Sequence, residues 1–557
     1  MKRLLLSPKF LLIWGIVVLA VPNIALSVTE KQTWLTALCN AFLPTSLYAL
    51  LLTSTRYTGK AAWWAFPLTF LAAFQVVLLY LFGSGVIAVD MWLNLVTTNA
   101  TEALELLDNL VPGLITVFGL YLPLIIISTI QALRHKVLPK TWQRTTRLLA
   151  LGGLTVGIGL YIACLRQPTF RTLKDIYPVN VVYNLKLAIE RTIKTARYRK
   201  TSANFSFEST NTHASDSAEV YILVVGETAR AGNFQLYGYK RETTPLLQGE
   251  RERLMVYPDV LTESNTTHKS VPMLLSAISA EDYDSIYHQK GIITAFREAG
   301  FYTLFVSNQR PNHSFIDFFG EEADEAYFLK SKDTEKEHYD LELLPYVANA
   351  LKQHKRLFVV LHTYGSHFNY HERYPDELAH FLPEANADAH YKNRESLLNA
   401  YDNTIRLTDQ VLHRLIAMTD SLPTALLYTS DHGEDIFDDQ RHLFLHASPN
   451  PSAYQLRVPF IISLSPSYRS TYPEVETILR SNLKQPVSSN ASVFHTMLDL
   501  AGIKSPYHRD SLSLASRHYK VRERYYLDDH NKKIPVTQLH LDDEDRNMLK
   551  GNNIYPF

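Results

Sequence analysis

The pattern of apolar and polar positions divides the chain into two halves of different character. Long apolar runs fill most of the chain up to residue 166, whereas shorter runs alternate with polar segments after residue 200. Long runs are typical of helices that cross a membrane, and short runs are typical of strands buried in a sheet. The pattern predicts a multi-domain protein, with a transmembrane domain over residues 1–166, a connector over 167–217 and a soluble α/β domain over 218–557.

Five runs are long enough to cross a bilayer, which takes roughly 20 residues each. They are Phe10–Val28, Trp34–Leu52, Ala61–Phe82, Val111–Leu133 and Leu148–Leu165. The first run follows Lys2 and Arg3, as the apolar part of a signal peptide does. Its apolar part is long, however, no clean small-x-small cleavage site follows it, and four more runs come after it. We therefore expect an uncleaved anchor and five spans.

Basic residues predict which loops stay in the cytoplasm. They collect before the first run, between the second and third, and between the fourth and fifth, as Lys2, Arg3, Lys9, Arg56, Lys60, Arg134, Lys136, Lys140, Arg144 and Arg147. With five spans, all three groups fall on one side of the membrane. The N-terminus is then cytoplasmic, and the chain after Leu165 lies on the other side, which is the periplasm if the membrane is a bacterial inner membrane.

The loop between the third and fourth runs and the connector both have amphipathic patterns. Asn94, Thr98 and Glu102 are spaced so that they share one helix face, which is either a solvated face or a strip that holds a lipid headgroup. The stretch Asp175–Lys200 has the pattern of a basic amphipathic helix, suited either to an anionic membrane surface or to a solvated linker. The polar stretch Thr201–Ser217 has the composition of a flexible linker.

The soluble half alternates predicted strands and helices, which favours an α/β fold with a mainly parallel sheet. The predicted strands are Val220–Val225, Tyr302–Val306, Leu357–Leu361, Ala425–Tyr428 and Val458–Leu464. The predicted helices include Ile292–Ala299 and Glu395–Met418. Polar residues directly follow four of these strands. Since ligands usually bind at the carboxyl ends of parallel strands, we expect one common site there.

The stretch Thr429–Asp435, T-S-D-H-G-E-D, places Asp431 and His432 directly after a predicted strand. Glu227 holds the equivalent place after another strand. Two carboxylates and one imidazole suit Zn²⁺ or another divalent ion, although an ordinary turn would also fit the stretch taken alone. Further along, His442 and His446 either complete such a site, assist proton transfer or play a structural part.

A hydroxyl next to a divalent ion has a lowered pKa and becomes a usable nucleophile. The stretch 262–276 supplies the candidates Ser264, Thr266, Thr267 and Ser270, and composition does not choose among them. The charge is balanced at 55 basic and 55 acidic residues, so no overall basic surface points to nucleic acid. Both cysteines, Cys39 and Cys164, lie in apolar N-terminal runs, which leaves the soluble half without a disulfide or a thiol nucleophile.

Six motifs occur in order along the soluble half. They are V-V-G-E-T-A-R at 224–230, Y-G-Y-K-R-E-T-T-P at 237–245, T-H-K-S-V-P at 267–272, G-S-H-F-N-Y at 365–370, Y-D-N at 401–403 and S-D-H-G-E at 430–434. Together with the five apolar runs, this order resembles the bacterial phosphoethanolamine transferases. That family is the membrane-bound branch of the alkaline phosphatase and sulfatase superfamily, and it modifies lipid A and the lipopolysaccharide core.

The resemblance implies a sulfatase-like catalytic domain in which Thr267 is the nucleophile and carries phosphoethanolamine covalently. The implied zinc ligands are Glu227, Thr267, Asp431 and His432. The implied substrate contacts are Asn94, Thr98, Glu102, Asn308, His367 and His446, of which the two histidines also match positions of a second metal. One zinc ion is expected, with room for a second, and Mn²⁺ or another divalent ion is the alternative.

The implied reaction moves phosphoethanolamine from phosphatidylethanolamine to lipopolysaccharide, at lipid A or a core sugar. The expected protein is a multi-pass, monomeric inner-membrane protein with its catalytic domain in the periplasm. The alternatives are a glycerophosphotransferase or phosphodiesterase acting on another periplasmic glycan, and an inactive membrane sensor. A sulfatase activity is disfavoured, because no C/S-x-P-x-R signature occurs near residues 264–276.

Two features depart from the family pattern. Relatives of the lipid A branch carry several periplasmic disulfides, and this chain has none in its soluble half. Some relatives also place a lysine shortly after the Asn308 position, where this chain has Pro311, Asn312 and His313. We therefore expect the fold to rely on its core and metal, and phosphate recognition to differ in detail.

Overall fold

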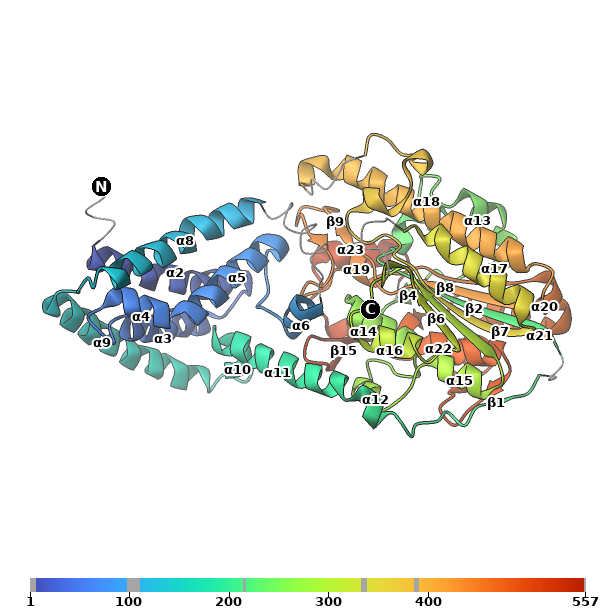
Figure 1. Ribbon diagram of the computed structural model, residues 1–557, viewed down its shortest axis with the longest axis horizontal. Helices are drawn as coiled ribbons and strands as arrows, with labels where there is room; N and C mark the ends of the chain where they lie inside the picture. Colours follow the sequence, from blue (N-terminus) through green and yellow to red (C-terminus); the bar gives the residue numbers. More distant parts are fainter. Residues whose placement is uncertain (1–6, 98–110, 214–216, 332–337, 385–389, 555–557) are drawn as a thin grey trace. The chain divides into compact units, whose positions relative to one another are not determined.

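The computed structural model describes residues 7–97, 111–213, 217–331, 338–384 and 390–554. The chain forms two compact units, Met1–Glu190 and Arg191–Phe557 (Figure 1). The boundary between them falls within helix α11 (Val179–Ala196). It therefore lies inside the stretch 167–217 that the sequence predicts to be a connector.

The N-terminal unit is helical. Within its described residues, four helices are long and apolar enough to cross a membrane: α2 (Pro8–Thr29), α3 (Trp34–Leu52), Leu114–Leu133 of α8 (Val111–Leu133), and α9 (Lys140–Cys164). Two shorter helices, α4 (Thr58–Trp64) and α5 (Phe66–Phe82), meet at an angle of 63°, and they make a fifth candidate span if the bent pair is counted as one.

The bend between α4 and α5 divides the predicted third span, Ala61–Phe82, into two helices. Pro67 stands in the first turn of α5. Its ring removes the backbone N–H that a continuous helix would use, so a helix begins more easily at this point than it passes through it. Gly59 of α4 also packs closely on α8, since a β-carbon there would lie 2.5 Å from the carbonyl oxygen of Ser128. This contact holds α4 in its own direction.

Polar side chains hold the irregular segment that precedes helix α6 (Val89–Thr97) in the N-terminal unit. Buried Gln75 donates from Nε2 to the carbonyl of Gly85 (2.8 Å) and accepts at Oε1 from the N–H of Ile87 (3.0 Å). Asn94 lies on α6. Thr98 and Glu102 lie outside the described residues, so the strip predicted with Asn94 stays a prediction.

The C-terminal unit is built around one mixed sheet, to which seven strands of the described chain belong. Their order is β3 (Leu254–Val256), β11 (Phe460–Leu464), β8 (Thr424–Ser430), β2 (Glu219–Gly226), β7 (Arg356–His362), β5 (Tyr302–Ser307) and β6 (Glu325–Phe328). The five strands from β8 to β6 are parallel, and β11 and β3 add antiparallel pairs at one edge. All five predicted strands and the mainly parallel sheet are confirmed.

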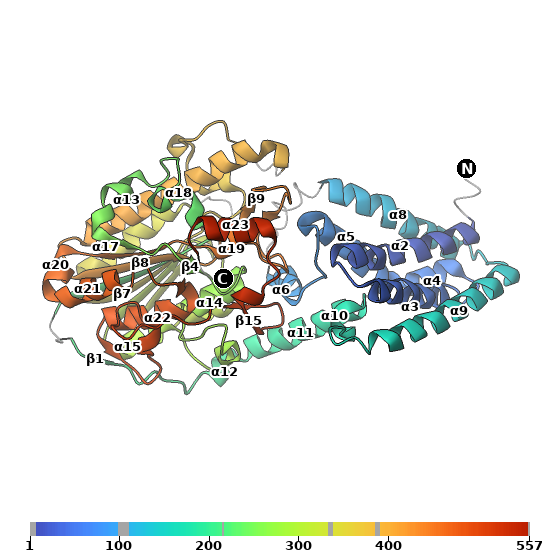
Figure 2. The same cartoon turned by 180° about the vertical axis from the view of Figure 1, so that it is seen from behind.

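Helices cover both faces of the sheet (Figures 1 and 2). One face carries α17 (Leu344–Gln353) and α18 (Arg394–Thr419), and the other carries α15 (Ile292–Glu298) and α22 (Ser489–Leu500). Every residue of β2 is buried, as expected for a strand covered on both sides. The sheet is thus an α/β core whose carboxyl edge is free to carry a site. The predicted helices 292–299 and 395–418 correspond to α15 and α18.

Short elements complete the C-terminal unit. The remaining helices are α12 (Tyr198–Thr201), α13 (Pro245–Gly249), α14 (Thr267–Leu274), α16 (Phe315–Gly320), α19 (Ala453–Leu456), α20 (Pro466–Thr471), α21 (Pro473–Ser481) and α23 (Asp543–Gly551). Two-stranded pairs are formed by β4 (Val260–Leu261) with β12 (Val487–Ser488), β9 (Asp435–Ile436) with β10 (Phe444–Leu445), and β14 (Tyr525–Leu527) with β15 (Lys533–Pro535).

The stretch predicted to be a flexible linker packs instead against the C-terminal unit over residues 202–213. Phe207 is fully buried, with its ring against those of Phe494 and Tyr507. Strand β1 (Thr210–Asn211) pairs with β13 (Ile503–Lys504). The stretch is polar on average, but it contains two phenylalanines, at 205 and 207. These supply enough apolar area to fix the segment.

Candidate active site

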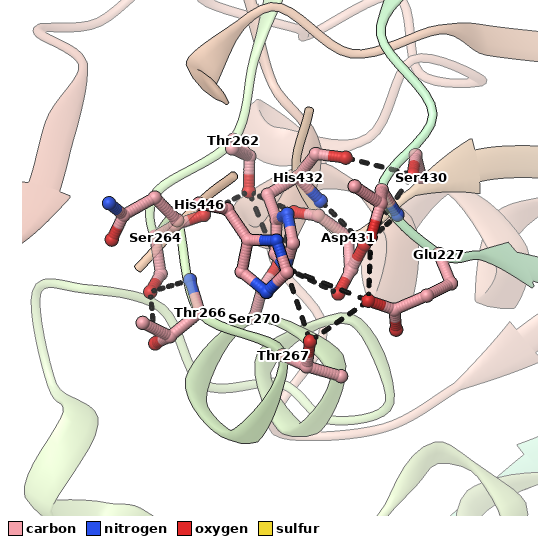
Figure 3. A network of polar contacts seen from close by, with 12 residues as sticks. Glu227, Thr262, Ser264, Thr266, Thr267, Ser270, Ser430, Asp431, His432 and His446 are labelled. Carbon is pink, nitrogen blue, oxygen red and sulfur yellow. Dashed lines mark hydrogen bonds and ion pairs between the residues drawn. The ribbon is translucent and has the colours of Figure 1, made fainter. Parts of the chain in front are cut away.

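The four predicted metal ligands meet at the carboxyl edge of the sheet, beside His446 (Figure 3). Strands β2 and β8 are neighbours and run in parallel, with Gly226 opposite Ser430. Glu227 follows the first strand, and Asp431 and His432 follow the second. These three side chains are completely buried, although all of them are polar. Since burying such groups is costly unless they bind something, their convergence indicates a ligand site.

Thr267 completes the group from the first residue of helix α14. Its Oγ1 lies 3.1 Å from Glu227 Oε1 and 3.1 Å from His432 Nε2. The other three candidate hydroxyls have different partners. Ser270 donates to the carbonyl of Asp431 (2.6 Å), and Ser264 and Thr266 contact each other (3.1 Å). Thr267 therefore has the contacts expected of a hydroxyl in the site.

The donor set fits a divalent cation. His432 Nδ1 lies 2.9 Å from the carbonyl of Gly433, so it carries the ring proton and leaves Nε2 with a lone pair. Nε2 is 3.2 Å from Asp431 Oδ2 and 3.8 Å from Glu227 Oε1. Asp431 Oδ2 is buried and has no hydrogen-bond partner among the described residues. Acceptor atoms that face one another at these distances are the arrangement that a metal ion stabilises.

Backbone and side-chain donors fix the carboxylates. Asp431 Oδ1 accepts from the N–H groups of Thr228 (3.0 Å) and His432 (2.7 Å). Glu227 accepts from the Thr228 hydroxyl at Oε1 (2.9 Å) and from Gln309 Nε2 at Oε2 (3.1 Å). Thr228 makes both contacts with φ at 60°, which is a costly conformation for a β-branched residue. Strain of this kind is typical of a functional site.

Burial controls the ionisation of these groups in the metal-free protein. Burial, followed by the nearby charge of Asp431, raises the pKa of Glu227 to about 8. Burial also raises the pKa of Asp431 to about 7, and it lowers the pKa of His432 to about 4. Near neutral pH the carboxylates therefore tend to hold protons and the histidine is neutral. A cation that binds here must displace those protons.

His446 lies beside the cluster and is oriented by Glu434. Its Nδ1 lies 3.0 Å from Glu434 Oε1, and its ring centroid is 4.2 Å from that of His432. Tyr370 donates its hydroxyl to Glu434 Oε2 (2.5 Å). One ligand atom each from Glu227, His432 and His446 lie within 4.8 Å of one another. His446 is thus close enough to share in metal or phosphate binding.

Two further histidines are placed differently. The ring of His367 stacks on Tyr364, with 5.0 Å between centroids, and lies 6.2 Å from that of His446. Burial, followed by the positive charge of Arg373, lowers the pKa of His367 well below its usual range. The ring of His442 instead packs against Tyr391, at 4.6 Å. His367 thus borders the site, whereas the contacts of His442 are with the surrounding loop.

Asn308 supports the neighbouring loop. Its Nδ2 donates to the carbonyl of His338 (3.0 Å) and to Asp340 Oδ1 (2.8 Å). The next residue, Gln309, is the one that reaches Glu227. Sequence reasoning gave no role to Gln309, Glu434 or Tyr370. The last two lie inside the motifs S-D-H-G-E and G-S-H-F-N-Y, which was the available signal.

Comparison with known proteins agrees with this geometry. The family model described as Sulfatase matches residues 219–503, more than half of the 557 residues. The chain belongs to the sulfatase family. The matched region includes every residue of the cluster around Thr267. The multi-domain prediction, with an apolar helical N-terminal part and a sulfatase-like C-terminal domain, is confirmed.

Several similar proteins carry the name phosphoethanolamine transferase. EptA of Escherichia coli K12 is 30% identical over 302 residues, which cover 52% of this chain and 54% of that protein. The chain therefore spans about half the length of this relative. EptC of the same strain is 25% identical over 458 residues, which cover 77% of each. The resemblance read from the six motifs is confirmed by these matches.

Solved structures show the same fold. The integral membrane protein lipooligosaccharide phosphoethanolamine transferase A from Neisseria meningitidis superposes with a TM-score of 0.70 at 20% identity, covering 91% of this chain and 97% of that one. The C-terminal periplasmic domain of Escherichia coli EptC, solved in complex with Zn, gives 0.54 at 24% identity, covering 61% and 98%. The first match extends through both units of this chain.

Proposed function

We propose that this protein transfers phosphoethanolamine from phosphatidylethanolamine to lipopolysaccharide, at lipid A or a core sugar, through a covalent phosphoethanolamine–Thr267 intermediate. One observation carries the proposal, namely the Thr267 hydroxyl at 3.1 Å from both Glu227 and His432. A hydroxyl held against a carboxylate and an imidazole is the arrangement expected of an activated nucleophile. The names of the relatives support the choice of transferred group.

The proposed metal is zinc, held by Glu227, Thr267, Asp431 and His432. Carboxylate oxygens and an imidazole nitrogen suit this ion, and the EptC domain of the same fold was solved with Zn. When bound, zinc would lower the pKa of the Thr267 hydroxyl and offset negative charge on the phosphate. His446 and His367 would hold the substrate phosphate, or a second ion, on the open side of this group.

The first half-reaction exchanges one ester bond for another. The Thr267 oxygen attacks the phosphorus of phosphatidylethanolamine, and the bond from phosphorus to the diacylglycerol oxygen breaks. The proton that Thr267 loses ends on the diacylglycerol hydroxyl, so the step is balanced. Glu227 Oε1 is placed to receive that proton first, because the hydroxyl already points toward it in the structure.

The second half-reaction reverses the first with a different alcohol or phosphate. An acceptor oxygen on lipopolysaccharide attacks the phosphorus, and Thr267 leaves and regains a proton. The hydrogen bond between His446 Nδ1 and Glu434 fixes that ring and leaves its Nε2 for the reacting groups. Because most of the work in phosphoryl transfer is positioning and charge stabilisation, such fixed side chains suffice.

The proposed setting is the bacterial inner membrane, spanned by the N-terminal helices, with the catalytic domain in the periplasm. The donor then lies in the same membrane, and lipopolysaccharide precursors pass through it. The apolar lengths of the N-terminal helices support this placement. We propose that the protein acts as a monomer.

The experiment that tests the function is a transfer assay with the purified full-length chain. Phosphatidylethanolamine labelled in its ethanolamine is supplied with zinc and with lipopolysaccharide, and the product is sought by mass spectrometry. The expected result is one added phosphoethanolamine group on lipid A or a core sugar, with diacylglycerol released in equal amount. Release of free phosphoethanolamine without an acceptor product would identify a phosphodiesterase. Transfer of glycerophosphate from phosphatidylglycerol would identify the alternative transferase.

A further inference from the structure

A hollow lies on the C-terminal unit, and none of its lining residues belongs to the cluster around Thr267. Its volume is about 310 Å³, and it is lined by Lys194, Arg197, Thr201, Asp284, Tyr287 and His288. The first three come from the end of α11 and from α12, and the others from the 3₁₀ turn Tyr283–Tyr287 and the residue after it. All six follow Arg191, so they belong to one compact unit.

The walls of this hollow are fixed to each other. The Thr201 hydroxyl donates to the carbonyl of Tyr287 (2.5 Å), and Tyr198 donates to the carbonyl of Gln289 (3.0 Å). The ring of Tyr198 packs against those of Phe315 and Phe319 in the core. Tyr287, which also lines the hollow, is buried. The hollow is therefore set by the core of the unit, although its charged side chains are exposed.

Charges of both signs line the hollow. Lys194 and Arg197 offer two cationic groups, which suit the oxygens of a phosphate. The Lys194 ammonium lies 5.2 Å from the centre of the Tyr287 ring, so that face already accepts a cation. Asp284 adds a carboxylate. A ligand that carries a phosphate and a nearby ammonium group matches this lining better than a purely anionic one.

We propose that this hollow binds the zwitterionic headgroup of phosphatidylethanolamine at a second, non-catalytic site. The phosphate would contact Lys194 and Arg197, and the ammonium would contact Asp284. Ile193, one helical turn before Arg197 and 47% exposed, offers an apolar contact for the lipid chains. The choice of this lipid over other zwitterions rests on the proposed function, because a donor lipid held on the unit that consumes it would be supplied at high local concentration.

The test uses the full-length chain with Thr267→Ala in nanodiscs of phosphatidylcholine, so that the first covalent step is blocked. Photoreactive phosphatidylethanolamine, with the reactive group near the headgroup, is compared with phosphatidylglycerol carrying the same group. Labelled peptides are mapped by mass spectrometry. We expect peptides containing residues 191–201 and 281–290 to be labelled more strongly by the ethanolamine lipid. Labelling does not depend on turnover, so it is independent of the outcome of the transfer assay.

Variants make the test specific. Lys194→Glu with Arg197→Glu should lower labelling of these peptides about tenfold, since each exposed charge contact contributes up to about a factor of five. Lys200→Glu, which reverses one charge on an exposed residue outside the lining, should leave it unchanged. Asp284→Asn should reverse the preference toward phosphatidylglycerol. The proposal is overturned if both lipids label these peptides equally, or if Lys200→Glu lowers labelling as much as the double variant, which would indicate only a nonspecific basic surface.

Discussion

The two ends of strand β2 carry two buried glutamates with opposite properties. At the amino end, Glu219 lies 3.0 Å from His213 Nδ1 and 3.8 Å from an Arg356 nitrogen, and it accepts the Tyr472 hydroxyl (2.5 Å). Burial alone raises the pKa of this carboxyl, but the bonds from His213 and Tyr472 bring it below its ordinary value.

At the carboxyl end, Glu227 is also buried, and burial together with the nearby charge of Asp431 raises its pKa to about 8. Glu219 is the first residue of β2 and Glu227 directly follows its last residue, and neither side chain is exposed to solvent. The difference lies in whether the chain itself supplies the compensating charge. Where it does, as at Glu219, the group is structural. Where it does not, as at Glu227, a bound cation would supply the compensating charge.

The largest difference between the two ends of β2 should appear when the matched variants Glu227→Gln and Glu219→Gln are compared. The first removes a charge from the proposed metal site and should lower zinc content and transfer by about 100-fold. The second should keep zinc and transfer but lower the free energy of unfolding by about 1–3 kcal/mol, because partners of a buried carboxylate are left unpaired.

Zinc content by elemental analysis, transfer rate and thermal unfolding together decide this comparison. If Glu219→Gln also lost its zinc while remaining folded, Glu219 would matter for zinc binding too, and the contrast between the two ends of β2 would be wrong. If Glu227→Gln kept zinc at wild-type occupancy, its carboxylate would not be a ligand.

The next effect concerns Glu434, which the structure places behind His446. Glu434→Gln should lower the transfer rate about tenfold while leaving zinc bound, because outer partners that orient a site residue typically matter by 10–100-fold. Tyr370→Phe removes only the hydroxyl that holds Glu434, so it should lower the transfer rate less than Glu434→Gln does. Rates and zinc content of the two variants are measured together. Equal rates for Glu434→Gln and wild type would remove the proposed orienting role.

A smaller effect is a change of zinc stabilisation with pH. In the metal-free protein Glu227 and Asp431 have pKa values of about 8 and about 7, above the ordinary range near 4. Between about pH 4 and about pH 8, the metal-free folded protein therefore keeps protons on these two carboxyls that the unfolded chain releases. The folded protein loses stability as the pH rises through this range. Zinc needs both groups ionised, so its affinity rises over the same window.

The rise in melting temperature caused by zinc should therefore be larger at about pH 8 than at about pH 6. Thermal unfolding with zinc and with a chelator at both values measures it. In Glu227→Gln the dependence on pH should weaken, since one of the two titrating groups is absent. A zinc effect that shrinks as pH rises would contradict the assignment of these carboxylates as ligands.

The same contrast explains how much the sequence predicted. The five main strands were predictable because each is a short apolar run that ends in polar residues, and Glu227, Asp431 and His432 were predictable because they stand at those ends. Composition did not choose among the four hydroxyls. The resemblance implied Thr267, which in the structure is the first residue of helix α14 and faces the site. The roles of Gln309 and Glu434 appeared only in space, since their partners lie 82 and 12 residues away.

Two features that the sequence did not reveal have local causes. The predicted third span contains a bend of 63°, which hydropathy does not show, because Pro67 hardly changes the hydropathy although it starts a new helix. The flexible linker was predicted from the average polarity of its residues. Phe207 is fully buried, and this single ring fixes a segment whose average composition is polar. Composition averages over residues, whereas packing depends on single ones.

The most direct test of the central claim is the intact mass of the full-length enzyme after incubation with phosphatidylethanolamine and zinc, without an acceptor. The wild-type chain should gain the mass of one phosphoethanolamine group, the gain should disappear on adding lipopolysaccharide, and Thr267→Ala should gain nothing. Thr267→Ser keeps a hydroxyl at the same place and should retain some labelling. A gain that persists in Thr267→Ala would move the nucleophile to another residue. No gain on the wild type while the lipid is consumed would contradict the covalent mechanism.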